Sequence, residues 1–187
     1  MIEGAKKRIF FPWVWWEEMD AEQLAFPDHT FDQVFCAFAL FFFPHIQKAL
    51  SEFKRVLKHT GILAVSTFGK KSALDEWISS QIEGWGIFAK LSTLKLDTPS
   101  LLKEHLIQAG FSQIEIYEES KICSYESGEA WWESLWTRAI RFRLEQLSLD
   151  QLQNLKQKAL RQAGPGRITE ERPVIYAIAK VIPNAIK

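Results

Sequence analysis

The stretch from Asp20 to Pro44, DAEQLAFPDHTFDQVFCAFALFFFP, decides the fold. It begins with a carboxylate, continues through a turn at Phe26–Thr30, and ends in an almost wholly apolar run. In the turn, proline presets φ, and the Asp and Thr side chains can satisfy local backbone groups. The run Phe31–Leu40 hardly alternates between polar and apolar residues, which is typical of a short strand covered on both faces in a parallel sheet. The stretch therefore predicts a buried strand with an acid at its rim.

A helix and a second strand follow this predicted strand. Pro44 can open a helix, because the first turn does not need its missing N–H. Apolar residues then recur at helical spacing and form one stripe: Ile46, Ala49, Leu50, Phe53, Val56 and Leu57. After Gly61, the run Ile62–Phe68 (ILAVSTF) is again mostly apolar and predicts a second buried strand. Strand, helix and strand with short links form a βαβ unit, and we expect its crossover to be right-handed.

The rest of the chain continues the alternation of helices and strands. Upstream, Ile2–Arg8 predicts a helix end, and Val14–Trp16 predicts a short strand by its bulk and aromatic character. Downstream, helices are predicted over residues 72–90, 98–110, 128–146 and 149–162, and strands over residues 111–125 and 173–181. This order predicts one α/β domain spanning residues 1–187, with a mostly parallel sheet and a helical insertion at 126–167 before the last strand.

Composition limits the classes of partner and site. Hydrophobic residues make up 47% of the 187-residue chain and charged residues 25%, as in ordinary globular proteins. Lys plus Arg equals Asp plus Glu, 23 against 23, so no electrostatic case exists for a nucleic-acid partner. The apolar run Val34–Pro44 is too short to span a bilayer, which needs about 20 residues. Two cysteines without a CxxC pattern, and scattered histidines, predict a cytoplasmic protein with no metal and no disulfide.

The segments DAEQLAFPDHTFDQVFCAFALFFF and KALSEFKRVLKHTGILAVSTFG resemble the central part of class I S-adenosylmethionine-dependent methyltransferases. The likeness is strongest to the small-molecule type 11 group, which includes the quinone C-methyltransferases. The later segments WWESLWTRAIRFRLEQL and PVIYAIAKV resemble that family's late helical insertion and final strand. The resemblance is dense over residues 17–70 and looser from there to residue 181. It implies a Rossmann-like sheet, S-adenosyl-L-methionine as the cofactor, and methyl transfer to a small-molecule acceptor.

The resemblance also implies which residues hold the cofactor. In the family an acid followed by alanine grips the adenine, so Asp20 and Ala21 are expected to take those roles. A charged acceptor suits the exocyclic amine of adenine, because such hydrogen bonds are strong. Cys36, Ala37 and Phe38, at the end of the next strand, would line the methionine side of the cofactor. Plain core packing explains these last three residues as well, since buried strands carry such side chains anyway.

For the acceptor, the resemblance points to Phe41 and Phe42 and to the later aromatic residue Trp132. Many family members carry histidine where this chain has Phe41 and Phe42, so the acceptor need not be shared. Trp132 belongs to a helix whose tryptophan spacing is also ordinary core spacing. No catalytic residue is assigned, because methyl transfer to a nucleophile depends mainly on proximity and orientation.

One family element has no counterpart in the sequence. The family carries a Gly-x-Gly turn upstream of its Asp-Ala pair, where glycine lets the backbone approach the cofactor. The first 19 residues hold one glycine, Gly4. We therefore expect residues 1–19 to be a truncated N-terminal part, and the strand at Phe31 to keep an open edge that favours self-association. The alternative function is a truncated, non-catalytic methyltransferase-like protein, either a remnant or a partner subunit.

Overall fold

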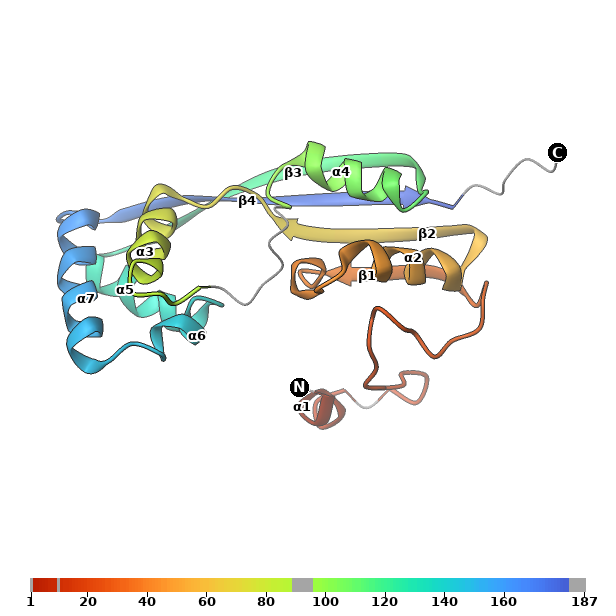
Figure 1. Cartoon of the computed structure of the whole chain (residues 1–187), viewed down its shortest axis with the longest axis horizontal. Helices are drawn as coiled ribbons and strands as arrows, with labels where there is room; N and C mark the ends of the chain where they lie inside the picture. Colours follow the sequence, from red (N-terminus) through yellow and green to blue (C-terminus); the bar gives the residue numbers. More distant parts are fainter. Residues whose placement is uncertain (1, 10, 89–95, 182–187) are drawn as a thin grey trace.

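The computed structural model describes residues 2–9, 11–88 and 96–181. Its four-stranded sheet has the order β1-β2-β4-β3, and Figure 1 shows it running through the length of the molecule. The strands are β1 (Phe31–Ala37), β2 (Leu57–Phe68), β3 (Ser112–Tyr125) and β4 (Ile168–Lys180). β1 pairs with β2 in parallel, whereas β4 runs antiparallel to both β2 and β3. The α/β class is confirmed.

The expectation of a mostly parallel sheet is wrong, because two of the three strand pairings are antiparallel. The last residue of β3, Tyr125, pairs with the first residue of β4, Ile168. The helices between β3 and β4 therefore return the chain to the same end of the sheet at which β3 finished. From that end β4 can run only antiparallel to β3. The final strand also begins five residues earlier than the predicted Pro173.

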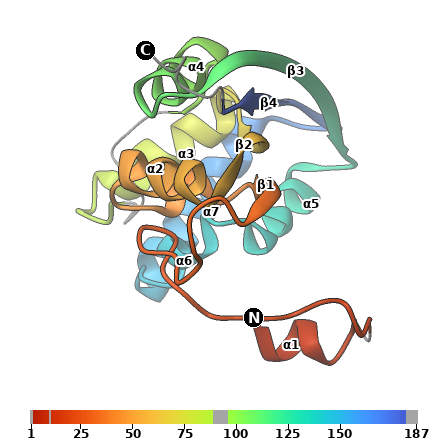
Figure 2. The same ribbon diagram turned by 90° about the vertical axis from the view of Figure 1, so that its right-hand side faces the viewer.

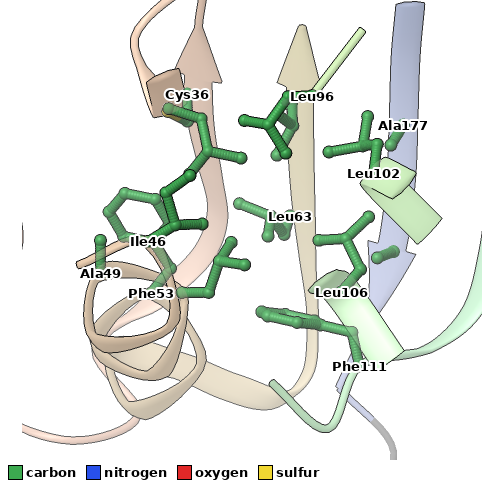
Figure 3. Packing of buried hydrophobic residues seen from close by; sticks show 14 of the residues in the cluster. Cys36, Ile46, Ala49, Phe53, Leu63, Leu96, Leu102, Leu106, Phe111 and Ala177 are labelled. Carbon is green, nitrogen blue, oxygen red and sulfur yellow. The ribbon is translucent and has the colours of Figure 1, made fainter. Parts of the chain in front are cut away.

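Two helices cover one face of the sheet. They are α2 (Ile46–Val56), which connects β1 to β2, and α4 (Pro99–Gln108), which begins after the N-cap Thr98. Figure 3 shows their apolar side chains meeting those of the strands. This first cluster includes Cys36, Ile46, Ala49, Leu50, Phe53, Leu63, Val65, Leu102, Leu106, Phe111, Ile175 and Ala177. The predicted stripe on α2 is thus confirmed as the side of the helix that faces the core.

The other face of the sheet is exposed in the part of the chain that the structure describes. Neighbouring strands place Phe35, Ala64 and Ile178 side by side on this face, with Tyr176 and Tyr117 next to one another. Phe35 is 72% exposed, and the two tyrosines and Ile178 are more than one third exposed. We call these residues the open face.

A second cluster lies at the far end of β3 and β4, away from β1 and α2 (Figure 1). It is built by α3 (Ala73–Glu83), α5 (Gly128–Ser134), η2 (Leu135–Thr137), α6 (Arg141–Leu144) and α7 (Leu149–Ala163). Its buried residues include Ile78, Trp131, Trp132, Leu135, Leu144, Leu155 and Ile168. The single helix predicted over 128–146 is broken into these shorter pieces. The predicted helix over 72–90 ends at Glu83, and its last two predicted residues lie outside the described ones.

A buried polar network joins the second cluster to the sheet. Glu170 on β4 lies between two arginines, at 3.3 Å from Arg138 and 2.8 Å from Arg172, and accepts a hydrogen bond from Ser72. Asp75 on α3 pairs with Arg138 at 2.8 Å and with Arg172 at 3.5 Å. Burial raises the pKa of Asp75, partly offset by the two arginines. Burial also tends to raise the pKa of Glu170, but hydrogen bonds from Ser72 and Arg172 outweigh this effect, so the pKa is lowered.

The N-terminal segment does not join the sheet. After α1 (Ile2–Lys6), the residues Val14–Trp16 form no strand, so that prediction is wrong. Bulk and aromatic character favour a strand only where a neighbouring strand supplies hydrogen bonds, and here the segment has none. Figure 2 shows α1 and the segment that follows it standing away from the sheet. No helix among the described residues has the length and apolarity needed to cross a membrane.

Candidate functional site

The carboxyl ends of the parallel strands β1 and β2 lie side by side, because Ala37 pairs with Ser66. Just beyond β1, the Phe38 N–H donates to the Ser66 carbonyl at 3.0 Å and contacts the Ser66 hydroxyl at 3.2 Å. Phe38 has a φ of 50°, in the left-handed region that large side chains rarely adopt. Strained backbone of this kind often marks functional positions, because the surrounding structure must hold it in place.

Four phenylalanines gather at these strand ends, and we call them the aromatic rim: Phe38, Phe41, Phe42 and Phe68. The ring centroids of Phe38 and Phe68 are 4.7 Å apart, and those of Phe41 and Phe68 are 5.7 Å apart. The short helix η1 (Leu40–Phe42) presents Phe41 and Phe42 together, at 4.7 Å. Phe42 and Phe68 are about half exposed, at 51% and 54%. Exposed aromatic rings at one place suit contact with a flat or apolar ligand.

Asp20 lies at the same end of β1 as the aromatic rim. The carboxylate of Glu22 accepts the His45 backbone N–H at 2.7 Å and contacts the His45 ring at 2.8 Å. This contact lowers the pKa of Glu22, chiefly through the hydrogen bond from the His45 backbone. Since His45 is the N-cap of α2, the contact fixes residues 20–22 beside the carboxyl end of β1. Asp20 itself is exposed, and its Oδ1 accepts the Glu22 N–H at 2.8 Å.

Arg55 on α2 holds the turn that the sequence predicted at Phe26–Thr30. Its guanidinium donates to the carbonyl oxygens of Leu24 at 2.9 Å and Phe26 at 2.8 Å. It also pairs with Asp28 at 2.7 Å and with Glu52 at 2.8 Å, and these two carboxylates raise its pKa. The segment from Asp20 to the start of β1 is therefore anchored along α2 at both ends. Sequence reasoning missed the contacts of Glu22 with His45 and of Arg55 with the turn, which join residues more than 20 positions apart.

The structure separates the other predicted cofactor residues. Cys36 is buried under α2, and burial raises the pKa of its thiol to about 11. Ala37 is exposed on the opposite side, as the alternation of a strand requires, and lines a shallow hollow of about 510 Å³ on the open face. Ala21 packs against the first cluster beside Asp20. Ala37 and Phe38 thus lie at the end of β1 with Cys36 on the opposite face in the core, whereas Asp20 and Ala21 lie on the segment that Glu22 ties to the start of α2.

Trp132 lies elsewhere. It is almost fully buried in the second cluster, which shares no member with the first. A second hollow, of about 720 Å³, lies just beyond the end of β2, between Lys70–Ala73, Asp97–Pro99 and the strands β3 and β4. Both charge signs line it. Among the described residues, no three His, Cys, Asp or Glu side chains gather closely enough to hold a metal ion.

Comparisons with known proteins agree on one family. Residues 1–65 match the family described as "Methyltransferase domain". The ubiquinone/menaquinone biosynthesis C-methyltransferase UbiE of Bordetella avium is 40% identical over 70 residues, which cover 35% of this chain and 27% of the relative. The UbiE protein of Neisseria meningitidis is 31% identical over 117 residues, covering 54% of this chain and 47% of the relative. The chain therefore spans less than half the length of these curated relatives.

A solved structure extends the likeness of fold over nearly the whole chain. The crystal structure of a SAM-dependent methyltransferase from Thermotoga maritima, a possible histamine N-methyltransferase, superposes with a TM-score of 0.54 at 17% identity. The superposition covers 96% of this chain and 68% of the other. At that identity the likeness concerns the fold, which is Rossmann-like in both. Residues 1–65 carry the methyltransferase domain match, and over part of its length the chain is similar to S-adenosylmethionine-dependent methyltransferases.

Proposed function

We propose that this chain transfers a methyl group from S-adenosyl-L-methionine to a small-molecule acceptor at the carboxyl ends of β1 and β2. The observation that supports the proposal is the contact between Glu22 and His45, which ties the segment with the exposed Asp20 to the start of α2, three residues after Phe42; all of these residues lie within the match to the methyltransferase domain. The relatives named above are quinone C-methyltransferases, and they support the reaction class. When bound, the cofactor would supply an electrophilic methyl group on its sulfonium sulfur.

The chain's residues fit the adenine end of such a cofactor. Asp20 is exposed and fixed by the contact between Glu22 and His45, so its carboxylate can accept from an exocyclic amine without rearrangement. Ala21 beside it is small, partly buried and packed against the first cluster. The exposed Ala37 and the strained Phe38 would border the methionine end, and the buried Cys36 would support them from behind. The raised pKa keeps the Cys36 thiol neutral, so it is not proposed as a nucleophile.

For the acceptor, we propose contact with Phe41 and Phe42, which η1 presents next to Phe68. Trp132 was also predicted to face the acceptor. Because Trp132 belongs to the second cluster, that contact requires the acceptor to lie against this cluster as well. The site as described would act by orienting the acceptor toward the methyl group and by excluding water with its aromatic rings.

We further propose that the protein is cytoplasmic, that it needs no nucleic acid, and that it self-associates through the outer edge of β1. The equal numbers of acidic and basic residues support the absence of a nucleic-acid partner, since there is no surplus of basic side chains to bind phosphates. The position of β1 at the edge of the sheet supports self-association.

Calorimetric titration with S-adenosylhomocysteine tests the site. Because the sequence has no Gly-x-Gly turn ahead of Asp20, we expect binding weaker than the micromolar range. Asp20→Asn should weaken binding by about 10-fold or more, the effect of removing a charged hydrogen-bond acceptor. Asp32→Asn is the matched control, because Asp32 is an exposed acid at the opposite end of β1, paired with Lys58 at 2.8 Å.

Three results are informative. Weak binding that depends on Asp20 and not on Asp32 supports the proposed site. Binding that is insensitive to Asp20→Asn would refute the assignment of the adenine end. No heat at any concentration, together with a folded protein by circular dichroism, would favour the alternative of a non-catalytic partner subunit.

A further inference from the structure

The two edges of the sheet differ in how they are protected. The edge strand β3 carries Glu115, Glu118, Glu119 and Lys121, and charges of this kind discourage pairing with another chain. The edge strand β1 has one charged residue, Asp32, which is already paired with Lys58. It has no proline, and Phe35 beside its edge is 72% exposed. Of the two edges, β1 is the one able to accept a further strand.

The same chain holds a segment suited to supply that strand. Residues Phe11–Trp16 (FPWVWW) are rich in the aromatic and β-branched residues that favour strands. Trp13 and Trp15 are 68% and 84% exposed, and Phe11 stacks on Trp13 with centroids 5.3 Å apart. Among the described residues, the backbone of this segment makes one local hydrogen bond, from the Val14 N–H to the Phe11 carbonyl at 3.1 Å. Within the described residues 2–9 and 11–18, no hydrogen bond connects this part of the chain to the sheet or its helices.

We propose that the Phe11–Trp16 segment of one molecule pairs with the open edge of β1 in a second copy of this chain, in a symmetric exchange. The contact between Glu22 and His45 fixes the base of the segment, while the segment itself stands away from the sheet (Figures 1 and 2). It is therefore placed to meet another molecule without any change in the folded body. A two-fold arrangement fills both edges at once and lets the segment's aromatic rings meet Phe35 on the open face.

Charge is compatible with this arrangement. The segment has no charged side chain between Phe11 and Trp16, and the outer edge of β1 offers only Asp32, so no like charges are brought together. The pairing would give unpaired backbone groups on both partners their hydrogen bonds. The proposal builds on the self-association suggested above but does not depend on cofactor binding, so each can fail without the other.

Sedimentation equilibrium of the full chain over a concentration series tests the exchange. The variant Val14→Pro/Trp15→Pro removes two adjacent N–H donors from the segment and should weaken dimer formation about 10-fold or more. The variant Phe35→Lys places a charge beside the β1 edge and should have a similar effect. Glu17→Pro/Glu18→Pro is the control, since it adds two prolines at exposed positions just outside the segment and should leave the dimer unchanged.

Mixing the two dimerisation variants gives the decisive result. The proline variant keeps an intact edge and the lysine variant keeps an intact segment, so a mixed dimer retains one of the two contacts. An equimolar mixture should therefore form more dimer than either variant alone. If the proline variant dimerises normally while the lysine variant does not, the β1 edges pair directly and the exchange is refuted. A wild-type chain that stays monomeric at all concentrations also refutes it, and circular dichroism confirms that each variant is folded.

Discussion

The substitution Glu170→Gln tests whether the polar network holds the second cluster to the sheet. The Glu170 side chain is only 1% exposed and lies between Arg138 and Arg172, which are themselves mostly buried. Removing one partner of a buried ion pair costs about 3–5 kcal/mol, because the remaining charge is left uncompensated. Asp75 would still face both arginines, so we expect the lower end, about 3 kcal/mol.

The assay is thermal and urea unfolding followed by circular dichroism. For a chain of this size, about 3 kcal/mol corresponds to a fall in melting temperature of about 6–12 °C. The matched control is Glu126→Gln, which breaks the pair between Glu126 and Arg167 at 2.7 Å on the surface. Both of those side chains are well exposed, and such pairs contribute about 0–1 kcal/mol. Equal effects of the two substitutions would refute the argument, because the network would then be no stronger than a surface contact.

Three further predictions follow from burial and charge. Leu50→Ala should cost about 2–5 kcal/mol in urea unfolding, because Leu50 is fully buried under the sheet, whereas Leu149→Ala at an exposed position should cost little. Cys36 should react with iodoacetamide at pH 8 about 100-fold more slowly than a thiol of pKa 9.0, because its pKa of about 11 leaves little thiolate. Mass spectrometry measures the rate of alkylation, with Cys123 in the same chain as the internal reference. The pKa of Glu170 is lowered in the folded state from 4.5, so its contribution to stability should be complete above pH 4.5 and lost as the pH falls through the lowered pKa. The variant Glu170→Gln should therefore lose less stability than the wild type between neutral and acidic pH, as measured by urea unfolding at each pH.

Local patterns predicted individual elements well. The apolar stripe of α2, the helix predicted over residues 98–110 and the strand predicted over residues 111–125 each depend on neighbours within a few positions, and the structure confirms them. The direction of β4 was not predictable in the same way. It depends on where the helices between Tyr125 and Ile168 return the chain, which is a property of their packing and not of the strand's own residues. The aromatic segment Val14–Trp16 failed as a strand for the related reason that its sequence cannot supply a partner.

The site divides along the same line. Asp20 was expected at the rim of the site, and the structure shows it exposed on a segment that is tied to the start of α2. The contacts that tie this segment down were not foreseen. Glu22 accepts a hydrogen bond from His45, and Arg55 binds the turn that follows. These pairs are separated by more than 20 residues, and charged side chains at such separations carry no periodic signal. The left-handed φ of Phe38 could not be foreseen either, because no glycine or asparagine marks it.

The division of the apolar residues into two clusters affects how the protein can change over time. The first cluster lies under α2 and α4, and the second lies among α3, α5 and α7; the strands β3 and β4 and the network around Glu170 connect them. Substitutions in regions that share no contacts have nearly additive effects. Mutations that reshape the helical end should therefore accumulate independently of those near the aromatic rim, so that one half of the molecule can diverge while the structure of the other half is preserved.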